Sequence, residues 1–364
     1  MKTFLRQFRA WYVRHERAAR AGAFAAGFLF DALTLPRIDL GYATLVLSAY
    51  LAIAAGGILL TAILAAGRLR LPATPRFLEW LELAVLFSFG NLMSGYAVLY
   101  AVSASFADSW PFLAMLLALF VGNELFRTFH RFLLFQLGML FVALFSYLAF
   151  SLPILLSSIG TGVFLLSGAL SLALFAAFAK LLERVDRARL RAMRRNLALT
   201  AAVIYTLFNV AYFGNLIPPI PLALRDIGVY HRVLTGTDGY TLVYEPAPWY
   251  LRFFSRTDSV YHRAEEEPVY VFSAIFAPTK LRTTIFHEWS RLDEEADAWV
   301  PRFRISFPII GGRDGGYRGY SLAERVEPGR WRVAVAAERG QVIGRISFTV
   351  VPAAAAPALV TRVE

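Results

Sequence analysis

The chain has 364 residues, of which 57% are hydrophobic and only 17% are charged, and its mean hydropathy is +0.52. A soluble globular protein is roughly half apolar and a quarter charged, so this composition excludes an ordinary soluble domain and indicates a membrane protein. The formal net charge is +11, and the absence of cysteine excludes disulfides and thiolate metal sites.

The positive charge is unevenly distributed along the chain. Residues 1–218 contain 19 Lys and Arg against 9 Asp and Glu, a net charge of +10, whereas residues 219–364 contain 18 against 17, a net charge of +1. The surplus therefore lies in the apolar half, where the retention of basic loops on the cytoplasmic side of a membrane explains it. We do not expect nucleic acid as a partner, although the sequence pI is about 10.0.

Apolar segments long enough to cross a bilayer occupy the first 218 residues. A helix needs roughly 17 to 25 apolar residues to cross the hydrocarbon core. Six segments reach this length with ease, and a further short one contains Asp31. The predicted spans are 21–38, 42–66, 82–104, 110–126, 132–152, 160–181 and 197–217. Residues 21–218 are thus predicted to form an α-helical polytopic membrane bundle of about seven helices.

The basic residues between these segments predict the orientation of the bundle. Lys and Arg accumulate in short loops on the cytoplasmic side. They cluster in the tail at residues 1–20, before the span at 82, around 127–131 and at 180–195, whereas the alternate loops contain only Arg37. We therefore expect a cytoplasmic basic tail at residues 1–20, seven crossings, and a C-terminal half on the opposite side of the membrane.

Three polar side chains inside the predicted spans require an explanation, because a polar group in lipid is costly. They are Asp31, Asn91 and Glu124. In the structural interpretation, Asp31 reaches the interface or pairs with Arg37, Asn91 belongs to a stripe of helix contacts, and Glu124 pairs with Arg127. In the functional interpretation, the three line a shared polar path through the membrane. The sequence favours the structural interpretation and leaves the other open.

The second half of the chain follows a proline-rich segment at 217–221. Short β-branched and aromatic runs then alternate with Pro, Gly and acidic clusters, a pattern typical of strands and loops. The clearest pair, 331–335 and 342–350, predicts a hairpin with one buried face. We therefore expect an all-β, immunoglobulin-like sandwich at residues 219–350, followed by a flexible C-terminal tail at residues 351–364.

The segment at 311–321, GGRDGGYRGYS, has the composition of a binding loop. A phosphate-binding loop needs a lysine and a following helix, which this segment lacks. Two interpretations are open: a tight connection braced by its arginines, or a surface for acidic or sugar-bearing ligands. The residues of the candidate ligand or partner surface are Arg313, Tyr317, Arg318, Tyr320, Trp289 and His287.

No catalytic constellation is visible in the sequence. Arg291 stands where a second histidine would complete HExxH after His287, and neither GxSxG nor SxxK occurs. The five histidines show no ligand spacing for zinc. We therefore expect a non-enzymatic protein without catalytic residues, metal or cofactor.

Motifs in the last hundred residues resemble those of a known bacterial family. They are His287-x-Trp289, Gly311-Gly312-Arg313-Asp314, Gly329-x-Trp331-Arg332 and Gly340-Gln341-x-x-Gly344. The pattern is similar to that of the bacterial membrane-protein family carrying the C-terminal domain of unknown function 2914, in its variant with a multi-helix membrane region ahead of the domain. The resemblance supplies no activity; it implies a bacterial inner-membrane protein with a β-rich C-terminal domain.

These observations predict a multi-pass protein of the bacterial inner membrane whose periplasmic β-sandwich binds an envelope partner, either a periplasmic protein or a glycan. Besides this partner, the lipid bilayer itself surrounds the helices. The alternative is a transport or lipid-handling component that uses the polar path. A membrane receptor is a weaker alternative, because no long cytoplasmic segment is expected to carry a signal.

A single introduced thiol can test this topology, because the chain contains no cysteine. We predict that a membrane-impermeant maleimide labels Asp314→Cys in cells with a permeabilised outer membrane and an intact inner membrane. Arg68→Cys, in a predicted cytoplasmic loop, should be labelled only after lysis. If Asp314→Cys behaves like Arg68→Cys, the predicted number of crossings is wrong.

Overall fold

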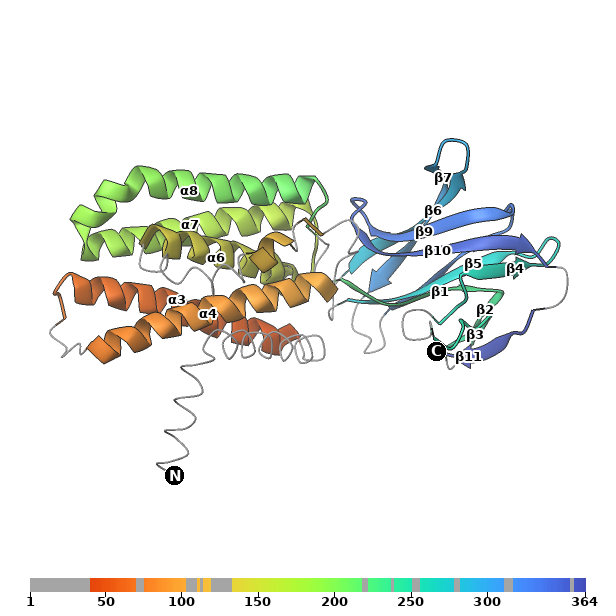
Figure 1. Cartoon of the computed structure of the whole chain (residues 1–364), viewed down its shortest axis with the longest axis horizontal. Coiled ribbons are helices and arrows are strands. Elements are labelled where there is room, and N and C mark those ends of the chain that lie inside the picture. The colour runs from red at the N-terminus through yellow and green to blue at the C-terminus, as the bar shows by residue number, and fades with distance from the viewer. Residues whose placement is uncertain are drawn as a thin grey trace, which may run out of the picture. The chain divides into compact units, whose positions relative to one another are not determined.

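The computed structural model describes residues 40–69, 75–102, 110–111, 114–118, 133–217, 222–236, 239–250, 256–277, 282–310, 317–353 and 357–364. Along the chain, a helical region precedes a region made of strands (Figure 1). The chain divides into two compact units, one within residues 1–99, 114–147 and 176–200, and the other within residues 100–113, 148–175 and 201–364.

Five long helices lie in the described part of the first half. They are α3 (Leu40–Ala65), α4 (Pro75–Val102), α6 (Leu133–Leu156), α7 (Thr161–Val185) and α8 (Arg187–Phe213). All five are long and apolar enough to cross a membrane, since even the 24 residues of α6 extend over about 36 Å at about 1.5 Å per residue. The helical character predicted from the sequence is confirmed, and the five apolar helices fit a membrane-embedded protein. Two further predicted spans, 21–38 and most of 110–126, lie outside the described residues.

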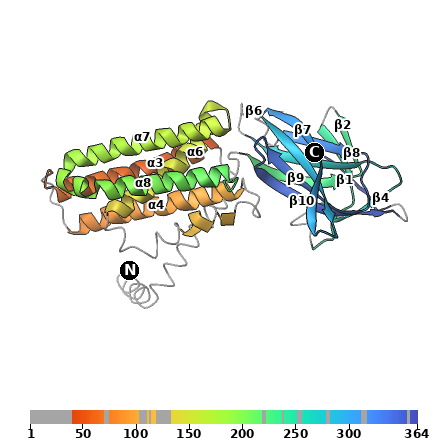
Figure 2. The same cartoon turned by 90° about the horizontal axis from the view of Figure 1, so that it is seen from above.

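Within the first unit, the helices run side by side (Figure 2) and pack through small residues and aromatic rings. A Cβ atom added at Gly57 on α3 would lie 2.4 Å from Val85 Cγ2 on α4, so glycine permits the close approach of these helices. The rings of Tyr50 and Phe87 meet edge to face at 6.0 Å. Tyr96 donates from its hydroxyl to the carbonyl of Ala143 on α6 at 2.9 Å, which satisfies a buried polar group.

Helices α7 and α8 are separated by one residue, Asp186. Its carboxylate accepts a hydrogen bond from the backbone N–H of Arg189 at 3.1 Å, as an N-cap does. The arginine-rich segment that the sequence assigns to a loop is therefore the first part of α8, where Arg191 pairs with Glu183 at 3.2 Å. Hydropathy did not predict this helix, because arginine is unfavourable in lipid and lowers the hydropathy of the segment although it is a good helix former.

Eleven strands are found in the described part of the second half. They are β1 (Ala223–Tyr230), β2 (Arg232–Gly236), β3 (Gly239–Tyr244), β4 (Val260–Arg263), β5 (Val269–Phe276), β6 (Arg282–Asp293), β7 (Ala298–Ile310), β8 (Tyr317–Ala323), β9 (Gly329–Ala337), β10 (Val342–Pro352) and β11 (Val360–Val363). They form three sheets, in the orders β1-β5-β8, β4-β10-β9-β6-β7 and β11-β3-β2. The predicted all-β region after the membrane helices is confirmed.

Strand β5 lies in the middle of this layered arrangement. Val269, Val271 and Ile275 point to one side, where they join cores shared with the five-stranded sheet. Phe272 and Ala274 point to the other side, where they pack on β2 and β3. Side chains alternate along a strand, so β5 is apolar on both faces because both faces are covered. The sheet β11-β3-β2 is thus a third layer, which a two-sheet sandwich does not contain.

The C-terminal segment is more ordered than the sequence predicts. Strand β11 pairs antiparallel with β3, from Val360 opposite Tyr244 to Val363 opposite Thr241. The prediction of a flexible tail at 351–364 is therefore wrong for these residues. Four residues are too few to show a strand period, and the partner strand lies far away in the sequence.

A glycine on β8 should tolerate no side chain. A Cβ atom built at Gly319 lies 2.5–2.9 Å from the ring of Phe307 on β7, whereas one built at Gly236 on β2 has only the Gly239 carbonyl oxygen nearby, at 3.6 Å. We predict that Gly319→Ala lowers the free energy of unfolding by about 1–3 kcal/mol through overpacking, and that Gly236→Ala has a much smaller effect. Urea unfolding of the full chain in detergent measures both. Equal losses would contradict this packing.

Candidate functional site

A buried polar network occupies the interior of the β region. His287 and Trp289 on β6 are both 0% exposed. His287 Nε2 lies 2.8 Å from Ser273 Oγ on β5, and His287 Nδ1 lies 2.8 Å from Ser321 Oγ on β8. Trp289 donates from Nε1 to the same Ser321 oxygen at 3.0 Å. The network therefore ties β6 of one sheet to β5 and β8 of another.

The chemistry of this network is structural. Burial lowers the pKa of His287 to about 3, so the imidazole is neutral at physiological pH. A serine next to a neutral histidine can act as a nucleophile only if a substrate reaches its hydroxyl, and both Ser273 and Ser321 are buried. Each ring nitrogen has a hydroxyl partner, which satisfies the buried polar atoms of the imidazole.

Two residues that the sequence predicts to line the candidate surface are buried instead. Trp289 and His287 lie on the inward side of β6 together with Ile285, which is also buried. The prediction that they contribute to a ligand surface is wrong, because the alternation of β6 carries positions 285, 287 and 289 to the same face. They form part of the core instead.

Strand β8 divides the other predicted surface residues between its two faces. Tyr317 packs against a buried cluster that includes Ile275 and Ile309. On the opposite face lie Tyr320, which is 38% exposed, and Arg318, whose Nε lies 3.9 Å from a Glu364 carboxylate oxygen. The remaining residue, Arg313, lies outside the described residues.

Tyr320 belongs to a group of tyrosines. Its ring centroid lies 6.2 Å from that of Tyr240 on β3 and 6.0 Å from that of Tyr270 on β5. We call Tyr240, Tyr270 and Tyr320 the tyrosine patch. Of the residues predicted to form the candidate surface, Arg318 and Tyr320 lie together on one face of β8. Tyr240 and Tyr270, which lie beside Tyr320, were not predicted from the sequence.

One predicted intramembrane polar residue is described by the structure. Asn91 on α4 donates from Nδ2 to the carbonyl of Phe87 one turn earlier, at 2.8 Å. This bond satisfies part of the side chain within its own helix. The predicted stripe of helix contacts stays a prediction. Asp31 and Glu124 lie outside the described residues, so the shared polar path stays a prediction.

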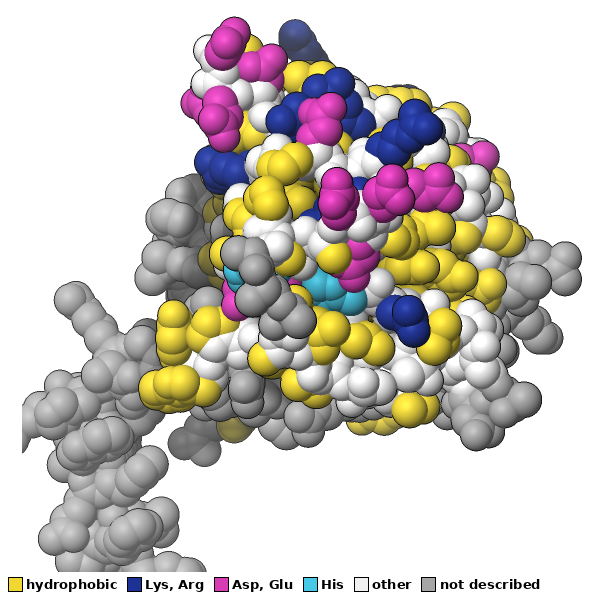
Figure 3. All heavy atoms as spheres, turned by 90° about the vertical axis from the view of Figure 1, so that its right-hand side faces the viewer, with side chains coloured by type: hydrophobic (Ala, Val, Ile, Leu, Met, Phe, Trp, Pro, Cys, Tyr) yellow, Lys and Arg dark blue, Asp and Glu magenta, His cyan; other side chains and the backbone are white. Residues whose placement is uncertain are grey.

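Among the described residues of the β region, the most exposed aromatic side chains are two that the sequence motifs did not indicate. Trp249 is 79% exposed and Tyr250 is 59% exposed, and their rings are nearly perpendicular, with centroids 5.9 Å apart. We call this pair the aromatic tip. The sequence PAPWY between two strands is the signal, but a turn composition alone does not reveal exposure. On the face of the molecule in Figure 3, hydrophobic side chains lie among acidic, basic and histidine side chains.

The base of the aromatic tip is held by backbone and side-chain contacts. The N–H of Ala247 donates to the carbonyl of Arg256, and the N–H of Asp258 donates to that of Glu245, both at 2.9 Å. Glu245 Oε1 also lies 3.0 Å from His231 Nε2, and Glu245 Oε2 lies 2.6 Å from His262 Nδ1. These contacts fix the two ends of the segment that carries the tip.

His231 is held between two carboxylates. Its Nδ1 lies 2.8 Å from Glu267 Oε1, and its Nε2 faces Glu245. The two carboxylates therefore hold the ring from both of its nitrogen atoms. Among the residues that the structure describes, no group of three or more His, Cys, Asp or Glu is suited to hold a metal ion.

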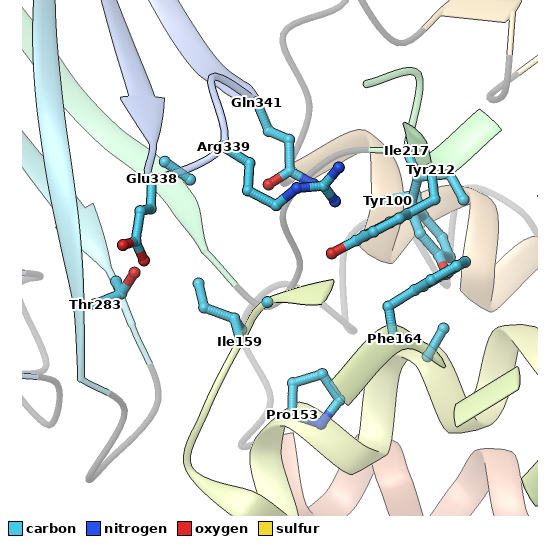
Figure 4. Close-up of a pocket in the computed structure, with 13 residues that line it drawn as sticks. Tyr100, Pro153, Ile159, Phe164, Tyr212, Ile217, Thr283, Glu338, Arg339 and Gln341 are labelled. Carbon is cyan, nitrogen blue, oxygen red and sulfur yellow. The ribbon is translucent and has the colours of Figure 1, made fainter. Parts of the chain in front are cut away.

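A pocket of about 60 Å³ lies within the second unit (Figure 4). It is lined by Tyr100, Ala149, Pro153, Ile159, Gly160, Phe164, Tyr212, Ile217, Thr283, Ala337, Glu338, Arg339 and Gln341. The rings of Phe164 on α7 and Tyr212 on α8 are stacked at 3.7 Å, and the guanidinium carbon of Arg339 lies 4.3 Å from the centre of the Tyr212 ring. The lining thus joins an apolar, aromatic wall to a cation.

Comparison with known proteins supports the resemblance noted in the sequence motifs. Residues 282–350 match the family model described as Protein of unknown function (DUF2914), which confirms that resemblance. No curated protein matches the chain. The solved structure of Pseudomonas fluorescens alkylpurine DNA glycosylase AlkC bound to DNA containing an abasic site analog is similar over 84% of this chain and 97% of that chain, at 10% identity and a TM-score of 0.20. This likeness is too weak to carry an argument about fold or function.

The buried imidazole should make stability depend on pH. The pKa of His287 is about 3 in the folded chain and near 6.5 when the side chain is exposed, so between these values the unfolded chain binds one more proton. The contribution of His287 to stability is therefore complete above about pH 6.5 and is lost as the pH falls. We predict that, between about pH 6.5 and 4.5, the free energy of unfolding decreases less steeply with falling pH in His287→Gln than in the unchanged protein. The difference in slope should correspond to about one bound proton, and urea unfolding at a series of pH values measures it. Identical slopes would show that the ring is solvated.

Proposed function

We propose that this chain is a non-enzymatic protein of the bacterial inner membrane whose β region binds a protein partner on the periplasmic side. The apolar helices fit a membrane-embedded protein, and the distribution of basic residues supports a C-terminal half outside the cytoplasm. The observation that carries the proposal is the aromatic tip, Trp249 and Tyr250, exposed at the end of a braced segment.

Exposed aromatic side chains of this size are typical of binding surfaces. Tryptophan and tyrosine are enriched at the centres of protein interfaces, where each buries a large area with few rotatable bonds. Because the base of the tip is already tied by Glu245 and the hydrogen bond between Ala247 and Arg256, less conformational entropy is lost when a partner binds. The tip therefore has the composition and the preorganisation of a docking element.

A protein partner is favoured over a glycan by the geometry of the tip. The planes of Trp249 and Tyr250 meet at 88°, so the two rings do not form one flat platform for a sugar ring. A perpendicular pair instead offers an edge and a face, which suits apolar and aromatic side chains of a protein. The tyrosine patch provides a further aromatic surface on β3, β5 and β8.

The described residues also favour binding over catalysis. The serine and histidine side chains that contact one another, Ser273, His287 and Ser321, are all buried. The contacts of His231 with Glu245 and Glu267 brace a segment of the chain rather than leave a reactive group exposed, since the His231 ring is itself buried and stacked on Tyr261 at 4.3 Å. A binding role therefore accounts for these residues better than a reaction does.

In-cell photo-crosslinking tests this function. We predict that a photo-reactive amino acid at Tyr250 in the full chain yields a discrete protein adduct, and that Trp249→Ala reduces its yield about tenfold by removing the larger anchor. The same photo-reactive residue at Arg302, an exposed position on β7, serves as the matched control and should give no such adduct. Adducts that consist of glycan or lipid, or that persist in Trp249→Ala, would contradict a protein partner at the tip.

A further inference from the structure

The pocket in Figure 4 lies where several apolar helices end. Tyr100 is the last residue of one candidate membrane span, Tyr212 is the penultimate residue of another, and Phe164 lies in the first turn of a third. The ends of membrane spans meet the lipid headgroups, and aromatic residues are enriched at this level. The helical part of the pocket lining therefore comes from residues that a bilayer would place at the depth of the lipid phosphates.

Arg339 brings an unsatisfied cation into this pocket. Its guanidinium carbon lies 4.3 Å from the ring centre of Tyr212 and 5.3 Å from that of Phe213, so aromatic faces cover one side. Its Nη1 atom is buried and has no hydrogen-bond partner among the described residues. A guanidinium stays charged at all physiological pH values, and a buried charged donor without an acceptor is costly.

The neighbouring carboxylate does not neutralise this cation. In Figure 4 the carboxylate of Glu338 lies beside Thr283, whereas the guanidinium of Arg339 points toward Tyr100 and Tyr212. Glu338 is exposed to solvent, and Gln341, which also lines the pocket, is buried and carries an amide that can donate. Among the residues that the structure describes, the pocket thus contains a positive charge and a neutral donor but no anion paired with the guanidinium.

We propose that Arg339 binds a phosphate group in this pocket and that the phosphate belongs to the headgroup of an anionic phospholipid. A volume of about 60 Å³ holds several water-sized groups of about 10–15 Å³ each, enough for the oxygens of one phosphate but not for a whole lipid. The pocket's apolar wall, which includes Pro153, Ile159 and Ile217, favours a lipid over a free ion, because the glycerol and acyl chains need apolar contacts where they leave the phosphate.

Arg304 provides a matched control for this arginine. Its guanidinium carbon lies 3.6 Å from the ring centre of Phe286, but its Nε pairs with Glu288 at 3.0 Å. Both arginines therefore stack on an aromatic ring, but within the described part of the chain Arg304 has a carboxylate partner and Arg339 has none. Replacing each arginine with glutamine removes the same charge. A difference in lipid binding between the two variants is therefore attributed to the unpaired guanidinium donor of Arg339.

Lipid binding by the full chain in detergent tests the proposal. Native mass spectrometry and thermal unfolding are followed as phosphatidylglycerol, phosphatidylcholine or inorganic phosphate is added. We expect phosphatidylglycerol to bind and to raise the unfolding temperature of the unchanged protein and of Arg304→Gln, and to bind about tenfold more weakly to Arg339→Gln. Arg339→Lys, which keeps the charge but not the planar fork, should retain part of the affinity and shows that the site can fold without arginine.

The other outcomes separate the sources of the phosphate. Stabilisation by inorganic phosphate that requires Arg339, with no preference for phosphatidylglycerol over phosphatidylcholine, would support the anion site and overturn the lipid as its source. Equal binding of phosphatidylglycerol to Arg339→Gln and Arg304→Gln would overturn the site itself. Trp249→Ala should leave lipid binding unchanged, because the lipid site does not depend on partner binding at the aromatic tip.

Discussion

The covering of β5 on both faces is the constraint on which the β region depends. A strand in that position must be apolar on both alternations, and VYVFSAIF meets this requirement at every position but one. The exception, Ser273, needs a partner inside the core, and His287 provides it. The second nitrogen of the same ring binds Ser321 of β8, so one polar position in the middle strand brings with it a network that spans two sheets.

Most of the fold could be predicted where the signal is local. Apolar length predicts the membrane helices, and the alternation at 331–335 and 342–350 predicts a hairpin that the structure confirms, with Trp331 opposite Phe348 and Val333 opposite Ile346. The third sheet could not be predicted in the same way. Its strands are short, and β11 finds its partner β3 across more than a hundred residues, a pairing that no local period records.

The candidate site was harder to predict, because the type of a residue does not reveal whether its side chain points to the surface or into the core. His287 and Trp289 resemble site residues by type, yet their alternation with Ile285 carries them into the core. Trp249 and Tyr250 lie in a turn that the sequence analysis did not select, although they are the more accessible pair. The lining of the pocket comes from segments around 100, 160, 212 and 339, and such a convergence follows from tertiary packing rather than from spacing.

The position of β11 affects the order in which the strands of the β region can pair. The hairpin of β2 and β3 is synthesised early, but the antiparallel partner of β3 is translated only after β10. Until then, one edge of β3 presents unpaired backbone groups of the kind that other chains can capture. This edge of β3 therefore stays open for longer than the opposite edge, which β2 covers as soon as the hairpin forms.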